Sequence, residues 1–198
     1  MGIYSLTRIF WSLYTTQSTE TRKPPRVVSS IQKYRPTGVD EAANIILTFP
    51  RDGHSGGNLV GIATTSFRIP SDIDNKRASG PAVRSQSTKG ELQVWSPIYR
   101  QTRISSFFLM GLSKDKHWSQ PGPGPGSNRH NGYLDNTYPE SEGYGMFWEA
   151  DEETLAPTEG RKAGRYEVLD ESTIVMDVMD EVRNQHDLHY PSNIKVTH

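Results

Sequence analysis

Several groups of residues have types and spacings that are typical of catalytic or metal-binding sites, and the first group surrounds a serine. Gly53-His54-Ser55-Gly56-Gly57 satisfies Gly-x-Ser-x-Gly, the pattern of the nucleophile elbow in α/β-hydrolases. An elbow needs a strand that runs directly into a helix, so that the serine hydroxyl is exposed beside backbone donors. The following residues, Asn58 to Ala63, have no helical period. The favoured interpretation is a hairpin loop, with a serine hydrolase using Ser55 as an alternative.

Two further groups carry metal-ligating or acid–base side chains. His186-Asp187-Leu188-His189 has side chains that bind zinc, but no third ligand set is evident in the sequence. Histidines at the C-terminal end of a helix are often there for its dipole. Glu149, Asp151 and Glu152 resemble a catalytic carboxylate pair, yet acids near a helix N-terminus form a favourable solvated face. We therefore expect no metal site and no carboxylate catalysis.

The composition limits the class of protein. The 198 residues include 17 Gly, 13 Pro and no cysteine, which rules out disulfides, thiolate catalysis and cysteine-based metal centres. A formal charge of −1 gives no general attraction to nucleic acid or to an anionic membrane. No apolar run is long enough to span a bilayer, and residues 1–14 do not resemble a signal peptide. We expect a cytoplasmic protein that has neither nucleic acid nor membrane as a partner.

The apolar spacing predicts the elements that must position these residues. A helix opens the chain, because apolar residues from Ile3 to Tyr14 recur at three- and four-residue intervals. Strands are expected at 27–34, 43–49 and 59–69, then a hairpin at 82–87 and 91–95 and a strand at 103–109. Short helices are expected at 146–153, stopped by Pro157, and from Asp170 to about Gln185. Neighbouring strands with short turns favour an α+β fold with an open, mainly antiparallel sheet and helices on one face.

Tyr4 lies off the main apolar stripe of the first helix, so its ring could project from the helix surface. Periodicity alone favours an ordinary surface tyrosine. The stretches Met1 to Thr7, Gly145 to Glu152 and Thr173 to Arg183, however, resemble the glucose–fructose oxidoreductase, inositol dehydrogenase and MocA family. Within it the chain is most similar to fungal NADP-dependent D-xylose and dimeric dihydrodiol dehydrogenases. The similarity covers the C-terminal half of such enzymes.

The resemblance implies a role for Tyr4. Members open this half with a helix carrying Asp-x-Gly-x-Tyr, and the aspartate would be the residue before Met1. It implies that Tyr4 transfers a proton to or from the hydroxyl of a sugar or cyclic diol, while hydride passes between the substrate and NADP. It also implies that Phe147 and Trp148 contribute pocket or interdomain packing. A lysine from Glu-Lys-Pro in the nucleotide-binding half assists the tyrosine in the family, and no Glu-Lys-Pro occurs here.

The Rossmann domain of the family is expected to be absent. No Gly-x-Gly-x-x-Gly follows a strand in the chain, so no NADP should bind this chain alone, which should be inactive by itself. Sheets of this family pair face to face, which implies self-association and a non-catalytic dimerisation or interaction module as an alternative function.

The expected organisation is one domain with an insertion. Residues 1–110 should form its main part, and residues 143–198 should complete it with helices. Residues 111–142, rich in Gly and Pro, should be a disordered insertion. Ile104–Glu142 and Glu153–Tyr166 depart from the family pattern, and a degenerate or mis-predicted gene product would explain this.

Overall fold

The computed structural model describes residues 2–70, 80–99, 101–108, 128–130, 133–138, 146–162 and 169–189. Contacts divide the chain into two compact units. The first unit comprises Met1–Ile69 and Ala163–His198, and the second unit comprises Pro70–Lys162. The strands of the two units form separate sheets, and the expected organisation as one domain with an insertion stays a prediction.

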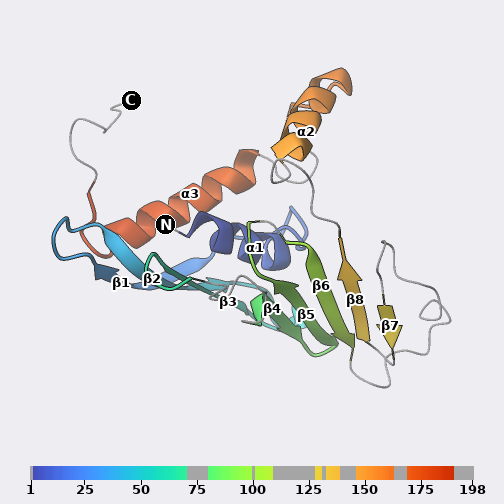
Figure 1. The fold of residues 1–198 in the computed structure, drawn as a ribbon, viewed down its shortest axis with the longest axis horizontal. Coiled ribbons are helices and arrows are strands. Elements are labelled where there is room, and N and C mark those ends of the chain that lie inside the picture. Colours follow the sequence, from blue (N-terminus) through green and yellow to red (C-terminus); the bar gives the residue numbers. More distant parts are fainter. Residues whose placement is uncertain are drawn as a thin grey trace. The chain divides into compact units, whose positions relative to one another are not determined.

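The first unit is a three-stranded antiparallel sheet with helices on one face (Figure 1). Its strands, in the order β1-β2-β3, are β1 (Arg26–Lys33), β2 (Asp40–Phe49) and β3 (Leu59–Ser66), with a short 3-10 helix η1 (Gly53–Ser55) between the last two. Helix α1 (Ile3–Leu13) contacts β3, and helix α3 (Leu169–Asn184) contacts β1. The α+β class and the antiparallel pairing agree with the sequence prediction.

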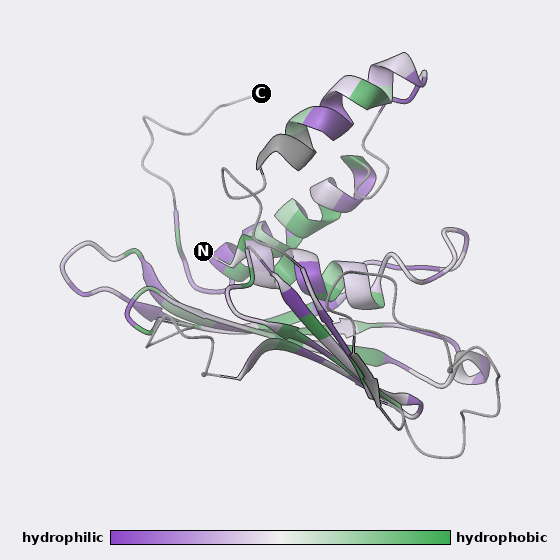
Figure 2. Ribbon diagram, turned by 45° about the vertical axis from the view of Figure 1, so that its right-hand side comes forward, coloured by the Kyte–Doolittle hydropathy of each residue, from purple (hydrophilic) through white to green (hydrophobic). Residues whose placement is uncertain are grey.

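The core of the first unit lies between these helices and the sheet (Figure 2). Leu6 and Phe10, one turn apart on α1, are 0% and 1% exposed, and the ring of Phe10 meets Phe49 edge-on at 5.4 Å. Helix α3 contributes Val175, Val178 and Val182, which are buried in the same core. The apolar period therefore locates both helices correctly, because only one stripe of each can be buried against a flat sheet.

Glycine lets α1 approach β3 closely. A Cβ on Gly61 would lie 2.5 Å from Cγ2 of Ile9, which is closer than real Cβ contacts allow. The absence of a side chain at Gly61 thus sets the distance between helix and strand.

The second unit holds a five-stranded antiparallel sheet in the order β4-β5-β6-β8-β7 (Figure 1). The strands are β4 (Pro81–Ser87), β5 (Gly90–Trp95), β6 (Arg103–Phe108), β7 (Asn128–His130) and β8 (Tyr133–Thr137), and helix α2 (Met146–Thr158) follows them. The β4–β5 hairpin and β6 confirm the sequence prediction. Strands β7 and β8 lie inside the segment 111–142 for which disorder was expected, and the rest of that segment lies outside the described residues.

Strand β8 forms through pairing that its own composition does not indicate. Ser105 on β6 is fully buried, and its hydroxyl donates to Oδ1 of Asp135 on β8 at 2.8 Å. The indole N–H of Trp95 donates to the same serine oxygen at 2.8 Å, and Arg103 forms an ion pair with Asp135 at 2.9 Å. Polar cross-strand partners therefore hold β8 where apolar alternation is lacking.

Helix α2 does not end where the sequence suggested. Pro157 was expected to stop it, but the helix continues to Thr158 and is ended by Gly160. Gly160 has φ 71°, its N–H donates to Pro157 O at 3.0 Å, and Arg161 N donates to Ala156 O at 2.8 Å. This is a Schellman motif, in which a left-handed glycine satisfies the last carbonyl groups. A proline in the last turn costs one backbone donor, which this cap tolerates.

Candidate functional site

Tyr4 lies in the first turn of α1, and its side chain is 59% exposed. Gly2, with φ 92°, occupies the N-cap position and provides no side-chain cap. Leu6 and Phe10 fix the rotation of the helix by facing the core, which turns Tyr4 away from the sheet. The sequence prediction of a projecting ring is confirmed, whereas its role in proton transfer stays a prediction.

The remaining residues implied by the resemblance are placed only by their backbone. Phe147 and Trp148 lie in the first turn of α2, and their side chains lie outside the described residues. The same holds for the side chain of Glu149. Glu152, one turn further along, forms an ion pair with Arg161 at 2.7 Å, which is a surface contact rather than a carboxylate pair. Tyr4 belongs to the first unit, whereas Phe147, Trp148 and Glu152 belong to the second unit.

Ser55 does not stand at a nucleophile elbow. It ends the 3-10 turn η1, and β3 follows and pairs antiparallel with β2. The elbow needs a strand–turn–helix arrangement, whereas this stretch is strand–turn–strand. The hydrolase alternative is therefore wrong, because the loop that contains Ser55 joins two strands of one hairpin.

The histidines at the end of α3 make a local polar contact. His186 Nε2 lies 3.1 Å from Oγ of Ser29 on β1, and the same hydroxyl donates to Gln185 Oε1 at 2.7 Å. Within the described part of the chain, no group of three or more His, Asp or Glu side chains could hold a metal ion. None of the described helices is long and apolar enough to cross a membrane.

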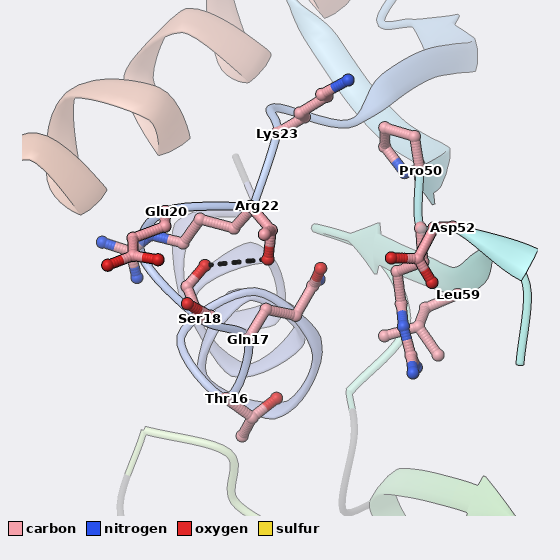
Figure 3. Close-up of a pocket in the computed structure, with 11 residues that line it drawn as sticks. Thr16, Gln17, Ser18, Glu20, Arg22, Lys23, Pro50, Asp52 and Leu59 are labelled. Carbon is pink, nitrogen blue, oxygen red and sulfur yellow. Dashed lines mark hydrogen bonds between the residues drawn. The ribbon is translucent and has the colours of Figure 1, made fainter. Parts of the chain in front are cut away.

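A cavity of about 750 Å³ lies beside the C-terminal end of α1 (Figure 3). Figure 3 shows Gln17, Ser18 and Arg22 on one side of it and Asp52 and Leu59 on the other. These residues come from the segment after α1 and from the loop after β2. The volume suits a small molecule, but most of the lining residues are polar, and they carry charges of both signs.

One residue that lines the cavity beside α1, Arg22, makes a long-range ion pair that the sequence does not predict. Nη1 of Arg22 donates to Oε1 of Glu171 on α3 at 2.6 Å, and the two side chains are 13% and 9% exposed. The guanidinium also lies 4.7 Å from the ring centre of Tyr14. Arg22 is thus held by its neighbours within the protein. No local sequence signal predicts this pair, because its members are 149 positions apart.

The cavity beside α1 lacks one feature that is common in dinucleotide sites. A pyrophosphate is commonly bound by the free N–H groups at a helix N-terminus, where the helix dipole is positive. This cavity lies at the C-terminal end of α1, where the dipole is negative, although Lys23 and Arg51 in its lining are cationic.

A smaller cavity of about 250 Å³ lies between the β1–β2 turn and the end of α3. Its walls are more apolar than polar, with Ile31, Ile45 and Met179 among the lining residues, and Asp40 and Arg183 also contribute. It does not include Tyr4 or any other residue implied by the resemblance.

Comparison with known proteins gives one relationship. No protein-family profile matches the chain, and no solved structure matches it. The chain is 36% identical over 194 residues to D-xylose 1-dehydrogenase (NADP(+)) of Hypocrea jecorina. The alignment covers 98% of this chain but 44% of that enzyme, so the chain spans less than half the length of its relative. The chain is therefore related to an oxidoreductase that uses NADP.

Proposed function

We propose that this chain corresponds to the substrate and oligomerisation domain of a cytoplasmic NADP-linked oxidoreductase of the D-xylose or dihydrodiol dehydrogenase type. The observation that carries the proposal is the 36% identity to D-xylose 1-dehydrogenase (NADP(+)) along almost the whole chain. The reaction class is hydride transfer between NADP and a hydroxyl-bearing carbon of a sugar or cyclic diol. The α+β fold, with an open antiparallel sheet, supports the same assignment.

In this proposal Tyr4 is the residue that exchanges a proton with the substrate hydroxyl. Its exposure, 59%, leaves the ring accessible to a ligand, and its place in the first turn of α1 gives it a rigid support. A phenol is a weak acid near neutrality, so it needs a neighbouring cation to act as an acid–base group. The Glu-Lys-Pro lysine that supplies this cation in the resembling family is not in this chain.

The cofactor belongs to the part of the relative that this chain does not cover. The sequence has no Gly-x-Gly-x-x-Gly, and the cavity beside α1 lies at the C-terminal end of that helix rather than at the N-terminal end that favours a pyrophosphate. We therefore expect the chain alone to bind no NADPH and to be inactive. A fluorescence titration of NADPH tests this, and saturable binding at micromolar cofactor would contradict it.

A chimera tests the proposed activity directly. The chain is fused behind the nucleotide-binding half of the Hypocrea jecorina enzyme, and NADP reduction is followed with D-xylose and with a cyclic diol. We expect turnover by the chimera, and a loss of about a hundredfold or more in kcat for Tyr4→Phe, because general acid–base groups contribute on that order. Tyr34→Phe, which changes another partly exposed tyrosine, is the matched control and should keep full activity. Equal rates for Tyr4→Phe and the unchanged chimera would remove Tyr4 from the mechanism.

A second function, a non-catalytic interaction module, is favoured by the outer face of the three-stranded sheet. Val28, Ile46 and Ile62 lie directly opposite one another on β1, β2 and β3. They are 51%, 41% and 67% exposed, so they form an apolar row on the face away from α1 and α3. Contiguous exposed apolar surface commonly marks an interaction site. We propose that this row supports self-association.

The self-association is tested by placing a charge in the apolar row. Light scattering across a dilution series should show oligomers of the unchanged chain and monomers of Ile62→Lys, because a lysine there would have to be desolvated. Val39→Lys, at a comparably exposed valine outside the row, is the control and should leave the oligomers intact. A monomeric unchanged chain at tens of micromolar would exclude the interaction module without affecting the dehydrogenase proposal.

A further inference from the structure

A groove of about 450 Å³ lies on one face of the five-stranded sheet in the second unit. Gln86 on β4, Glu91 on β5 and Phe107 on β6 are direct neighbours in the strand register, and all three line the groove. Gln93, two positions along β5 and therefore on the same face, lines it too. The groove thus combines a carboxylate, two amides and an aromatic ring.

The carboxylate of Glu91 has no capacity left for a ligand. Oε1 accepts from Nε of Arg84 at 2.7 Å and from the Gln93 amide at 2.6 Å. Oε2 accepts from Nη2 of Arg84 at 2.9 Å and from the Gln86 amide at 2.8 Å. These four hydrogen bonds use about all the acceptor sites of a carboxylate. Since Arg84 also balances its charge, the groove offers a cation no free anionic partner.

The same hydrogen bonds orient the two amides toward a ligand. Each amide directs its NH2 group to Glu91, so its carbonyl oxygen points away from the carboxylate. Within the described residues, no hydrogen bond to the carbonyl oxygens of Gln86 and Gln93 is found. Two acceptors in a fixed orientation suit a ligand that has several hydroxyl donors.

An aromatic ring lies beside these acceptors. Phe107 is 41% exposed, and its ring centre lies 4.7 Å from that of Tyr133 on β8. The pair holds the Phe107 ring in place while leaving part of it open to the groove. A partly exposed aromatic ring beside hydrogen-bond acceptors can bind a ring molecule that places its C–H face on the aromatic ring and donates from hydroxyl groups at its edge.

We propose that the groove formed by Gln86, Glu91, Gln93 and Phe107 binds a neutral saccharide, with the C–H face of a pyranose ring on Phe107 and its hydroxyls donating to the two amide oxygens. The Arg84–Glu91 pair has no net charge, so the groove provides no electrostatic attraction for a charged sugar over a neutral one. This site goes beyond the proposed dehydrogenase reaction, and none of its residues belongs to the Tyr4 site.

Gly90 keeps the groove open at the β5 end. It has φ 152°, and a Cβ there would lie 2.0 Å from the backbone oxygen of Phe107. Any side chain at Gly90 would therefore push β5 away from β6 and displace Phe107 from the amides.

Titration calorimetry with the full chain tests the proposal. Methyl β-D-xylopyranoside, methyl β-D-glucopyranoside and cellobiose are the neutral probes, and glucuronate and glucosamine are the charged ones. We expect at least one neutral probe to bind saturably with a millimolar dissociation constant. The charged probes should bind at least about tenfold more weakly, because their charged groups find no partner in the groove and lose hydration. Phe107→Ala should weaken the binding of the neutral probe by about tenfold or more.

Matched variants distinguish saccharide binding in this groove from binding elsewhere on the chain. Phe67→Ala removes a 75% exposed phenylalanine of the first unit and should leave binding unchanged, whereas Phe107→Tyr should retain it. If Phe107→Ala unfolds by circular dichroism, Gln86→Ala on an exposed position of β4 should show the same loss. The proposal is overturned if no neutral saccharide binds, if glucuronate or glucosamine binds equally well, or if Phe67→Ala weakens binding as much as the groove variants. None of these outcomes bears on NADP reduction by the chimera.

Discussion

Among single residues, Glu91 shows how neighbouring side chains keep a partly buried carboxylate ionised. The hydrogen bond from Arg84, followed by those from Gln93 and Gln86, lowers the pKa of Glu91 from 4.5 to about 2. The carboxylate therefore stays ionised through the whole physiological range. Because the folded pKa is depressed, the stabilisation from this group is present above its unfolded pKa and is lost as the pH falls from about 4.5 to about 2.

We expect Arg84→Gln to raise the pKa of Glu91 toward its ordinary value, because the largest cause of the shift would be removed. Carboxyl carbon NMR across an acid titration measures it. Lys89→Gln, in the turn of the same hairpin, is the control and should leave the pKa of Glu91 in place. An unchanged pKa of Glu91 in Arg84→Gln would show that the hydrogen bonds from Gln86 and Gln93 are enough to keep the pKa low.

Residue-level prediction from the sequence succeeded where a periodic pattern was enough. The exposure of Tyr4 follows from its position relative to Leu6 and Phe10 on one helix. The cluster at Glu91 could not be found this way, because it depends on which residues of β4, β5 and β6 face each other. A shift of one residue in either pairing would place those side chains on opposite faces of the sheet.

Among the elements, the segment after α1 is tied to α3 by the Arg22–Glu171 pair, whose two atoms lie 2.6 Å apart. Glu171 is 9% exposed at its side chain, so its charge depends on Arg22 for compensation. This contact joins the segment after α1 to the last described helix of the chain, and both belong to the first unit.

We expect Arg22→Gln to destabilise the protein by about 3 kcal/mol, because it leaves a nearly buried carboxylate without a partner. The double variant Arg22→Gln with Glu171→Gln should recover part of this loss, since no buried charge remains. Urea unfolding of both single variants and the double variant gives the coupling energy. Additive losses would mean that the pair does not interact energetically.

Element boundaries were predicted well where local chemistry decides them and poorly where tertiary contacts do. The apolar period gave α1 and α3 to within one or two residues. For α2 the sequence pointed to Pro157, but the Schellman motif at Gly160 ends the helix. Strand β8 was missed because its stability depends on Ser105 and Arg103 of β6 rather than on its own residues.

At the scale of the whole molecule, the chain holds two sheets with different kinds of core. The first unit buries aliphatic and aromatic side chains such as Leu47 and Phe49, both 0% exposed. The second unit buries Ser105 within a hydrogen-bonded network around Asp135. The sequence predicted the α+β class and the antiparallel pairing, whereas strand periodicity does not indicate how the strands divide between the two sheets.

We expect calorimetry to show two unfolding transitions, one for each unit. Phe49→Ala should lower only the transition of the first unit, by about 3–5 kcal/mol of stability. Ser105→Ala should lower only that of the second unit, by about 1–3 kcal/mol, because Trp95 and Asp135 lose a buried partner. One transition that both variants shift together would show that the units unfold cooperatively.

The close fit of α1 on β3 makes the placement of Tyr4 depend on a residue far from it in sequence. A methyl group at position 61 would overlap the Ile9 side chain, so a larger residue there requires Ile9 or the helix itself to shift. We expect Gly61→Ala to change the position of α1 on β3 and with it the position of Tyr4, because both residues belong to the same helix. A change at Gly61 would then act on the tyrosine without altering the tyrosine itself.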